Sequence, residues 1–276
     1  MRRMLVGGIG VLAVATLGGC NVGAARNEFR DERTVEGAIG TVAIAGGAGS
    51  VTVSGSSDGS IRVKRHIFYR DNRPGATDSV KGDTLTLNTD CGRVCWVDYE
   101  VTAPRGIRVT GHNGSGDVAL SDVASVSLDI GSGEVRIRRV AGDVAVSAGS
   151  GDLDLSDVAG SVAGRTGSGN VRVAGAAGAT TLDTGSGDID ARDLRGPRTT
   201  AHTGSGNATL ALTSAQDVNA ETGSGDVRIT VPGGQSYQVA ATTDSGDSHV
   251  RVPTDPAAKN RIKLRTDSGN VTVEQR

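Results

Sequence analysis

The chain has 276 residues, of which glycine supplies 42 and proline only 6, and its formal net charge is −2. Glycine and proline together are too few for a low-complexity chain, and the small charge excludes disorder driven by self-repulsion. Valine outnumbers leucine by 33 to 14, which favours strands over helices. With only six aromatic residues and no basic excess, the chain also lacks the composition of a nucleic-acid-binding protein.

The first twenty residues have the pattern of an export signal. Arg2 and Arg3 form a positive start, and the apolar run Leu5–Leu17 follows. This run is too short to cross a bilayer as a helix, so it predicts a secretory leader. The leader ends in Leu17-Gly-Gly-Cys20, which resembles the lipobox of bacterial lipoproteins, where the cysteine is lipidated and becomes the first mature residue.

We therefore predict a signal peptide over residues 1–19, a lipid on Cys20, and a polar tether over residues 20–33. The expected location is the outer face of the bacterial cytoplasmic membrane, with the lipid as the contact to the membrane. An ordinary signal peptide followed by a chance cysteine is the alternative.

The two remaining cysteines, Cys91 and Cys95, lie between two runs of alternating residues. A straight strand would hold them roughly 13 Å apart, too far to bridge. A hairpin tip containing Gly92 would bring them together, and an exported compartment permits disulfides. We predict a local Cys91–Cys95 disulfide, because a metal site needs more ligands and no nearby His or Cys supplies them.

An internal repeat governs the rest of the chain. The tripeptide Gly-Ser-Gly recurs at short intervals, and two Asp-Ser-Gly variants end the series. The closing glycines are 17 to 19 residues apart at first, and the last two intervals widen to 21 and 23. The copies lie at residues 114–116, 131–133, 149–151, 167–169, 185–187, 204–206, 223–225, 244–246 and 267–269.

Apolar or small residues alternate with polar ones on both sides of each turn, as in Val126 and Leu128 before it and Val135 and Ile137 after it. This pattern predicts two short strands per repeat, each with one buried face. A unit of about 18 residues cannot bury that face alone, so neighbouring units must stack. A meander of β-hairpins is the competing fold, but it does not require the same residue type in the same slot of every repeat.

The predicted fold class is therefore all-β, a parallel two-sheet β-solenoid of about 18-residue coils over residues 106–276. The less regular residues 34–105 are expected to form an N-terminal β cap on it. One outward slot supports the stacking. Its residues alternate in charge from coil to coil, so stacked neighbours attract each other. They are Arg136, Asp154, Arg172 and Asp190.

Acidic residues follow many of the turns and raise the question of a metal. Stacked along the rod, these residues would form a ladder similar to that of calcium β-rolls. Asn interrupts the ladder, however, and the acidic residues recur at a different spacing along the chain. The alternative is turn chemistry, because Asp and Asn bond the local backbone in tight turns. The candidate calcium ligands are Asp117, Asp152, Asp188, Asp226 and Asp247.

A basic segment, with Arg62, Lys64, Arg65, Arg70 and Arg73 within 12 residues, could contact an anionic envelope polymer or lipid head groups. A solvated strand and loop is the alternative. The four histidines have no metal-ligand spacing, and no zinc or phosphate-loop signature occurs. We expect no enzyme and no cofactor.

One stretch carries a resemblance to a known family. The segment Val97-Asp-Tyr-Glu-Val-Thr-Ala-Pro104, followed by repeated Gly-Ser-Gly-Asp-Val-x-Leu, resembles a bacterial domain of unknown function labelled "putative adhesin". The resemblance covers roughly residues 40–276. It implies an exported solenoid, often from high-GC Gram-positive bacteria, and it supplies no catalytic residues.

Together these observations predict a cell-envelope lipoprotein that displays a non-catalytic, adhesin-like binding or scaffold module. Its partners would be the membrane and an envelope polymer or surface protein, and no nucleic acid. The alternative function is a calcium-binding solenoid that uses the turn carboxylates.

Overall fold

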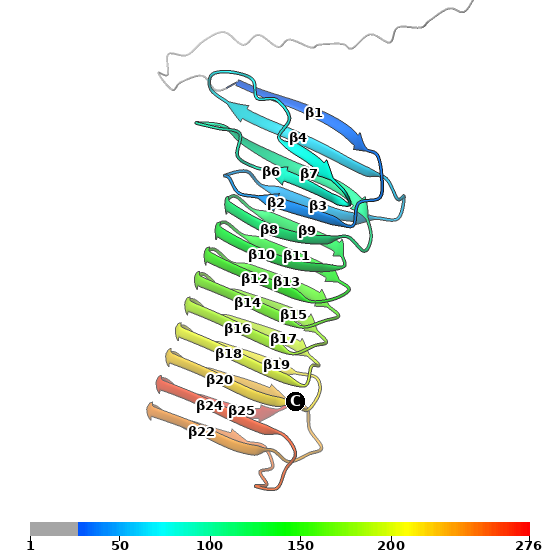
Figure 1. The fold of residues 1–276 in the computed structure, drawn as a ribbon. Coiled ribbons are helices and arrows are strands. Elements are labelled where there is room, and N and C mark those ends of the chain that lie inside the picture. The colour runs from blue at the N-terminus through cyan, green and yellow to red at the C-terminus, as the bar shows by residue number, and fades with distance from the viewer. Residues whose placement is uncertain (1–26) are drawn as a thin grey trace, which may run out of the picture.

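The computed structural model describes residues 27–276, and all of its named elements are strands. They form a 13-stranded and a 12-stranded sheet, which face each other along a rod (Figure 1). The predicted signal peptide and Cys20 lie outside the described residues. Within residues 27–276, no helix has the length and apolarity needed to cross a membrane.

Each regular coil consists of one strand from each sheet. The first such coil joins β8 (Arg108–Ser115) to β9 (Val118–Val123) through a Gly-Ser-Gly turn, and every regular strand pairs in parallel with its counterparts in the next coils. The following strands are β10 (Ser125–Ser132), β11 (Val135–Val140), β12 (Val144–Ser150), β13 (Leu153–Val158), β14 (Val162–Ser168), β15 (Val171–Ala176), β16 (Thr180–Ser186), β17 (Ile189–Leu194), β18 (Arg198–Ser205), β19 (Ala208–Leu212), β20 (Asp217–Ser224) and β21 (Val227–Val231). The prediction of a parallel two-sheet β-solenoid is confirmed.

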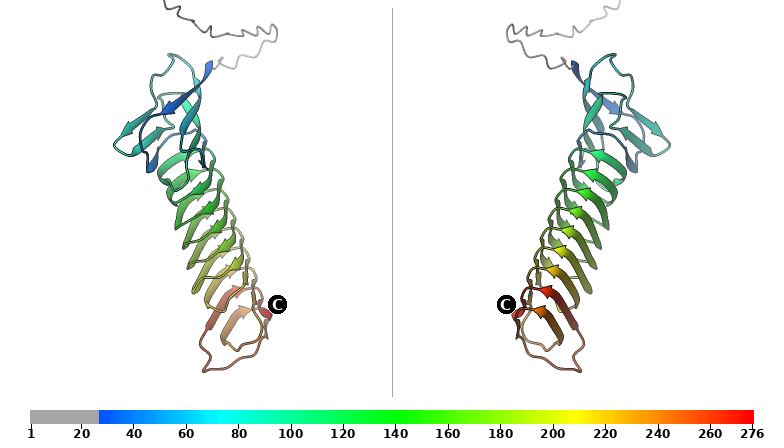
Figure 2. Two further views of the ribbon diagram at one scale, coloured as in Figure 1. Left: turned by 90° about the vertical axis from the view of Figure 1, so that its right-hand side faces the viewer. Right: turned by 90° about the vertical axis from the view of Figure 1, so that its left-hand side faces the viewer.

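The core is a thin layer of aliphatic side chains between the sheets. In β11, Val135 and Ile137 are fully buried while Arg136 between them faces solvent, as period-2 alternation requires. All six aromatic residues of the chain lie outside residues 108–231. The spacing of the two sheets in the regular coils therefore suits Val, Leu, Ile, Ala and Thr, and the coils form one continuous rod (Figure 2).

The expected stacking of charges is present in the register. Arg136 lies beside Asp154, and Asp154 beside Arg172. The ion pairs, however, also run to the turn carboxylates, because Arg172 reaches Asp152 at 2.9 Å and Arg136 reaches Glu134. Charges of opposite sign therefore alternate along this outward column. The shortest ion pairs of its arginines, however, are formed with acidic residues at the turns.

The turn glycines meet the backbone of the neighbouring coil. Gly151 has a φ of +127°, which disfavours a Cβ, and a Cβ built there would lie 2.0 Å from the carbonyl oxygen of Gly133. The carbonyl oxygen of Gly151 in turn accepts a hydrogen bond from the buried Thr166 hydroxyl of the next coil, at 3.1 Å. Such threonine bonds recur up to Thr266 and satisfy glycine carbonyls that would otherwise face the core.

The solenoid extends into the segment predicted to be a cap. Strands β2 (Thr41–Ala45) and β3 (Val51–Ser56) pair in parallel with β8 and β9, and β6 (Thr84–Asn88) and β7 (Trp96–Pro104) stack in parallel on their other side. The same two sheets therefore continue across the boundary that the sequence analysis places between residues 105 and 106.

Three antiparallel strands complete the N-terminal end. They are β1 (Asn27–Val35), β4 (Ile61–Tyr69) and β5 (Asp78–Lys81), which pair with β4, with β7 and with β6 respectively. The predicted tether over residues 20–33 is wrong for residues 27–33. These polar residues form β1, because β4 supplies a complete antiparallel partner and leaves one face of the strand to solvent.

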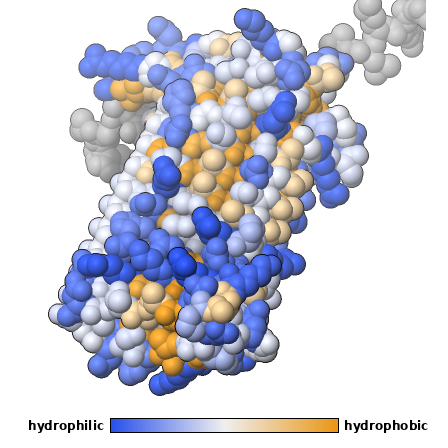
Figure 3. Space-filling view, turned by 60° about the horizontal axis from the view of Figure 1, so that its bottom comes forward, coloured by the Kyte–Doolittle hydropathy of each residue, from blue (hydrophilic) through white to orange (hydrophobic). Residues whose placement is uncertain are grey.

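At the other end, the coils do not stack in chain order. The last coil, β24 (Arg261–Ser268) and β25 (Val271–Gln275), inserts between the β20–β21 coil and the coil of β22 (Gln238–Ser245) and β23 (Ser248–Arg251). In Figure 1 the red β24 lies between β20 and β22. We call the end formed by β22 and β23 the distal end. Its inner residues, such as Val250, stay partly exposed, and apolar side chains show there in Figure 3.

The close approach at the turns makes a quantitative prediction. Gly234→Ala adds a Cβ at a positive φ of +85° with no atom within 4 Å, so it tests the backbone conformation alone. We expect it to lower the free energy of unfolding by about 1 kcal/mol. Gly151→Ala adds the overlap with Gly133 and should lower it by on the order of 3 kcal/mol. Urea denaturation of the full chain measures both, and equal losses would contradict the stacked-turn geometry.

The exchanged order of the last two coils is testable by cross-linking. Arg265 is the direct neighbour of Glu221 on one side and of Thr242 on the other. Mild oxidation should therefore join the cysteines of Glu221→Cys/Arg265→Cys, because neighbouring strands hold their Cα atoms within disulfide reach. The matched pair Glu221→Cys/Thr242→Cys should stay unlinked, since a strand separates the two positions. The reverse result would show stacking in chain order.

Candidate functional site

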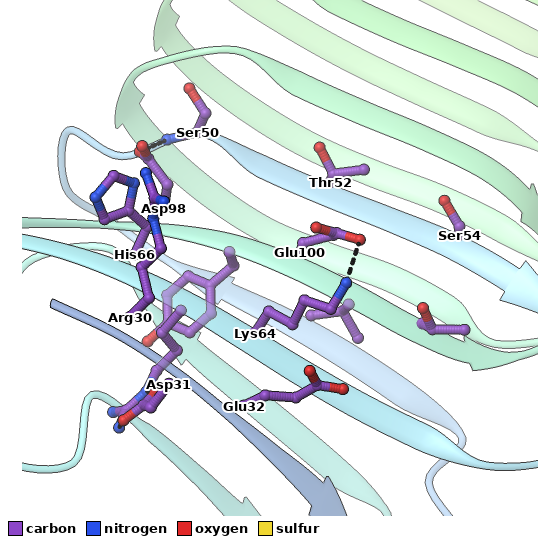
Figure 4. A pocket seen from close by; sticks show the side chains of 14 residues that line it. Arg30, Asp31, Glu32, Ser50, Thr52, Ser54, Lys64, His66, Asp98 and Glu100 are labelled. Atoms are coloured by element: carbon purple, nitrogen blue, oxygen red, sulfur yellow. Dashed lines mark hydrogen bonds and ion pairs between the residues drawn. The ribbon is translucent and has the colours of Figure 1, made fainter. Parts of the chain in front are cut away.

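One hollow lies on the outer face of the 13-stranded sheet near its N-terminal end (Figure 4). We call it the N-terminal hollow. It has a volume of about 710 Å³ and is lined by strands β1, β4, β7 and β3. Outward side chains of these strands point into it, with Lys64, Glu100 and Thr52 among them. Hydroxyl groups and charged groups therefore share one shallow surface.

The charges of the N-terminal hollow are largely bonded to one another. Lys64 Nζ lies 3.1 Å from Glu100 Oε1, and His66 Nε2 lies 2.9 Å from Glu28 Oε2. Asp98 accepts a 2.8 Å hydrogen bond from the backbone N–H of Ser50. Because acids and bases balance here, the surface favours a polar ligand without a strong preference for either sign of charge.

The structure does not bring the five predicted basic residues together. Arg62 and Lys64 point outward from β4, and each pairs with an acid, Arg62 with Asp58 at 3.2 Å. Arg65 lies on the opposite face of the strand, where it contacts Asp31. The remaining two, Arg70 and Arg73, follow the strand; Arg73 sits 3.8 Å above the Phe29 ring.

Arg65 belongs to a buried structural network. Its Nη1 donates to Thr77 Oγ1 at 3.1 Å and lies 3.5 Å from Asp78. The hydroxyl of Tyr99 donates to the Thr77 carbonyl oxygen at 2.7 Å, and burial raises the pKa of that hydroxyl. These bonds fix β4 and β7 to the loop before β5, so Arg65 serves the fold here.

Cys91 and Cys95 are joined by a disulfide, with their Cα atoms 5.2 Å apart. The bridge closes the turn between β6 and β7. Gly92 in this turn has a φ of +114°, a backbone conformation that favours glycine. The disulfide lies in the loop that joins the two strands of the outermost N-terminal coil.

The acidic turn residues form a hydrogen-bonded ladder along the rod. The side-chain oxygen of Asp152 accepts from the backbone N–H of Asn170 at 2.8 Å, and Asn170 accepts from the N–H of Asp188 at 3.0 Å. The Asn170 amide also donates to the Asp152 carboxylate. The bond from Asn170 N–H and the neighbouring Arg172 guanidinium hold the pKa of Asp152 below its usual value.

Because the last two coils exchange places at the distal end, Asp and Asn continue to alternate along this ladder. In chain order the last three members are Asp226, Asp247 and Asn270, which would stack two carboxylates directly. In the structure Asp226 accepts from Asn270, and Asn270 accepts from Asp247. Among the described residues no group of three or more His, Cys, Asp or Glu could hold a metal ion. The contacts therefore favour the turn-chemistry interpretation over the calcium one.

A calcium chelator distinguishes these interpretations. Because backbone N–H groups and Asn side chains already donate hydrogen bonds to carboxylates of the ladder, we expect chelator to leave the melting temperature of the protein unchanged. Thermal melts followed by circular dichroism measure this directly. A melting temperature that rises with millimolar calcium, and not with sodium chloride of equal ionic strength, would restore the calcium interpretation.

A second hollow, which the sequence analysis missed, lies on the outer face of the 12-stranded sheet near the distal end. We call it the distal hollow; its volume is about 510 Å³. Strands β18, β20, β24 and β22 bring its charged residues together from distant parts of the chain. These residues are Arg198, Asp217, Lys259, Arg261 and Lys263. These residues come together because the last two coils exchange places. In the sequence, only the order of Asp and Asn at the last turns could have indicated that exchange.

Comparisons with known proteins identify a family and related solved structures. The model of the family described as Toastrack DUF4097 matches residues 36–173 and again residues 114–274. No curated protein matches the chain.

Several solved structures are similar at low sequence identity. One is a "putative adhesin" from Bacteroides fragilis, with 15% identity over 92% of this chain and 99% of that one and a TM-score of 0.43. Another is a "putative adhesin" from Parabacteroides distasonis, with 13% identity over 91% and 97% of the two chains and a TM-score of 0.38. A "putative cell adhesion protein" from Clostridium sporogenes has 13% identity over 91% and 100% and a TM-score of 0.24.

Proposed function

This chain belongs to the Toastrack DUF4097 family, and we propose that it is an exported lipoprotein that displays a non-catalytic, adhesin-like binding module. In this proposal the lipid on Cys20 holds the N-terminal end of the rod at the membrane. The β-solenoid then carries the distal end away from the membrane surface. The partner would be an envelope polymer or a surface protein.

The observation that carries the proposal is the position of the two ends. Strand β1, which begins at Asn27, lies at one end of the rod, and the outermost coil β22–β23 lies at the other (Figure 1). In the sheet that contains both β1 and β23, the parallel stack from β9 to β23 comprises nine strands. At about 4.8 Å per strand this stack alone is about 40 Å long. A lipid before β1 would therefore present the distal end outward.

The side-chain contacts support binding or scaffolding over catalysis. In the N-terminal hollow His66 bonds to Glu28, and the hydroxyl of Ser50 accepts a bond from the backbone N–H of Asp117 at 3.2 Å. A serine nucleophile would instead need a general base, such as the imidazole, as its hydrogen-bond partner. The stacked scaffold holds these paired charges on a rigid surface. Such a preformed surface is suited to binding a partner, which replaces the water on it.

Lipid attachment and display are tested together in cells. We expect the full chain to incorporate a palmitate analogue and the variant Cys20→Ser to lose that label. In intact cells an impermeant amine-reactive biotin should label the wild type, because Lys259 and Lys263 are exposed at the distal end. An introduced cytoplasmic protein of known abundance serves as the control for cell integrity.

Two results would contradict this proposal. One is a mature N-terminus that mass spectrometry shows to be unlipidated or to retain the leader. The other is biotin labelling that requires cell lysis, since the module would then not be displayed.

A further inference from the structure

We propose that the distal hollow binds the anionic group of an acidic polysaccharide. The inference rests on the proposed function in one respect: display would place this hollow on the part of the rod farthest from the membrane. The binding chemistry itself depends only on residues of the described chain.

The charge of the distal hollow is strongly one-sided. Four cations, Arg198, Lys259, Arg261 and Lys263, share it with a single carboxylate, Asp217. Counting these side chains gives +3, whereas the whole chain carries −2. In the larger N-terminal hollow the paired charges of Arg65 and Asp31 cancel. The remaining two cations and three acids give −1 with the histidine neutral. An anion is therefore attracted to the distal hollow and not to the other one.

The single carboxylate is already engaged. Asp217 Oδ2 lies 3.5 Å from Arg198 Nη2, and its Oδ1 accepts a 3.0 Å hydrogen bond from the backbone N–H of Arg261. Within residues 27–276, neither Lys259 nor Lys263 takes part in an ion pair or side-chain hydrogen bond. Both lysines are exposed. Two ammonium groups thus remain available for a ligand.

In the next outward row of the same sheet, by contrast, a cation is surrounded by acids. Arg265 lies one outward position beyond Lys263 on β24, and it pairs with Asp267 at 2.9 Å and Asp244 at 3.3 Å. Glu221 lies 3.9 Å away on its other side. The absence of comparable acids around Lys263 is therefore local to the hollow and does not extend over the whole sheet.

The rim of the distal hollow is held in place before any ligand binds. Gln238 accepts bonds from Arg261 Nε at 3.3 Å and Nη2 at 3.2 Å, and its own amide donates to the Ala258 carbonyl oxygen at 2.6 Å. Its backbone N–H donates to the Asn260 carbonyl oxygen. These four bonds fix the segment that carries Lys259 and Arg261, which reduces the entropy lost on binding.

Neutral polar groups complete the lining and favour a sugar over a bare ion. Thr200 and Asn219 lie in the outward row that also contains Lys263. A hydroxyl and an amide can donate and accept bonds with sugar hydroxyls. The guanidinium and ammonium groups bind a carboxylate or sulfate on the same residue. The hollow of about 510 Å³ has the size of small-ligand sites and is open, as a polymer requires.

Titration calorimetry on the purified full chain tests this inference. The probes are polygalacturonate for carboxylate, dextran sulfate for sulfate, unmodified dextran for the neutral sugar, and inorganic polyphosphate for charge alone. We expect binding of at least one acidic polysaccharide, weakening as salt rises, and no binding of neutral dextran. The stronger of the two acidic probes identifies the anionic group.

A matched pair of variants locates the site. Lys259→Ala/Lys263→Ala should weaken binding of the acidic polysaccharide at least tenfold, because hydrogen bonds to charged groups are removed. Arg62→Ala/Lys64→Ala removes the same charge from the N-terminal end and should leave affinity unchanged. All four side chains are exposed on strands or a loop, and thermal melts verify that both variants fold.

Three outcomes would overturn the inference: no binding of either acidic polysaccharide, equal weakening by both variants, or binding of polyphosphate as tight as that of the polysaccharide. None of them bears on lipidation of Cys20 or on surface labelling, so the proposed function can stand if this inference fails. Conversely, binding in solution would persist if the chain proved not to be displayed.

Discussion

The structure depends on the contact between one turn and the next. At each regular turn the closing glycine lies so close to a carbonyl oxygen of the neighbouring coil that a Cβ has no space, as at Gly151 against Gly133. This contact fixes the register of the turns, and the register fixes which side chains stack in the core and on the surface. The threonine hydroxyls inside and the Asp–Asn ladder outside both depend on that alignment, because each bonds to the backbone of an adjacent coil.

Periodic features of the sequence predict much of this architecture. The spacing of Gly-Ser-Gly and the alternation around it are local, so they identify strands, turns and stacking without knowledge of distant contacts. The Cys91–Cys95 disulfide is also local, since only three residues separate the two positions. The N-terminal coils were harder to identify, because a long antiparallel excursion through β4 and β5 separates β2–β3 from β6–β7 and hides the repeat.

The candidate sites are less accessible to sequence reasoning. The basic segment around Arg65 is dense along the chain, yet alternation in β4 sends its members to opposite faces and neighbouring strands supply acids. The distal hollow shows the opposite case, because Arg198 and Lys263 are far apart in the chain and meet only through the coil order. The order could have been inferred from Asp226, Asp247 and Asn270. Their order in the chain breaks the Asp–Asn alternation that begins at Asp152, and the folded rod continues that alternation to its end.

The exchanged coil also has a consequence for how the chain is made. A solenoid stacked in chain order could fold coil by coil as the chain is synthesised. Here the edge of the β20–β21 coil is completed only by residues 261–275, which form β24 and β25 and follow β22 and β23 in the chain. Residues 238–251 reach their final neighbours only after that late segment has arrived. The distal end is therefore completed only after residues 261–275 have been made, and a chain that stopped before them would expose unpaired strands.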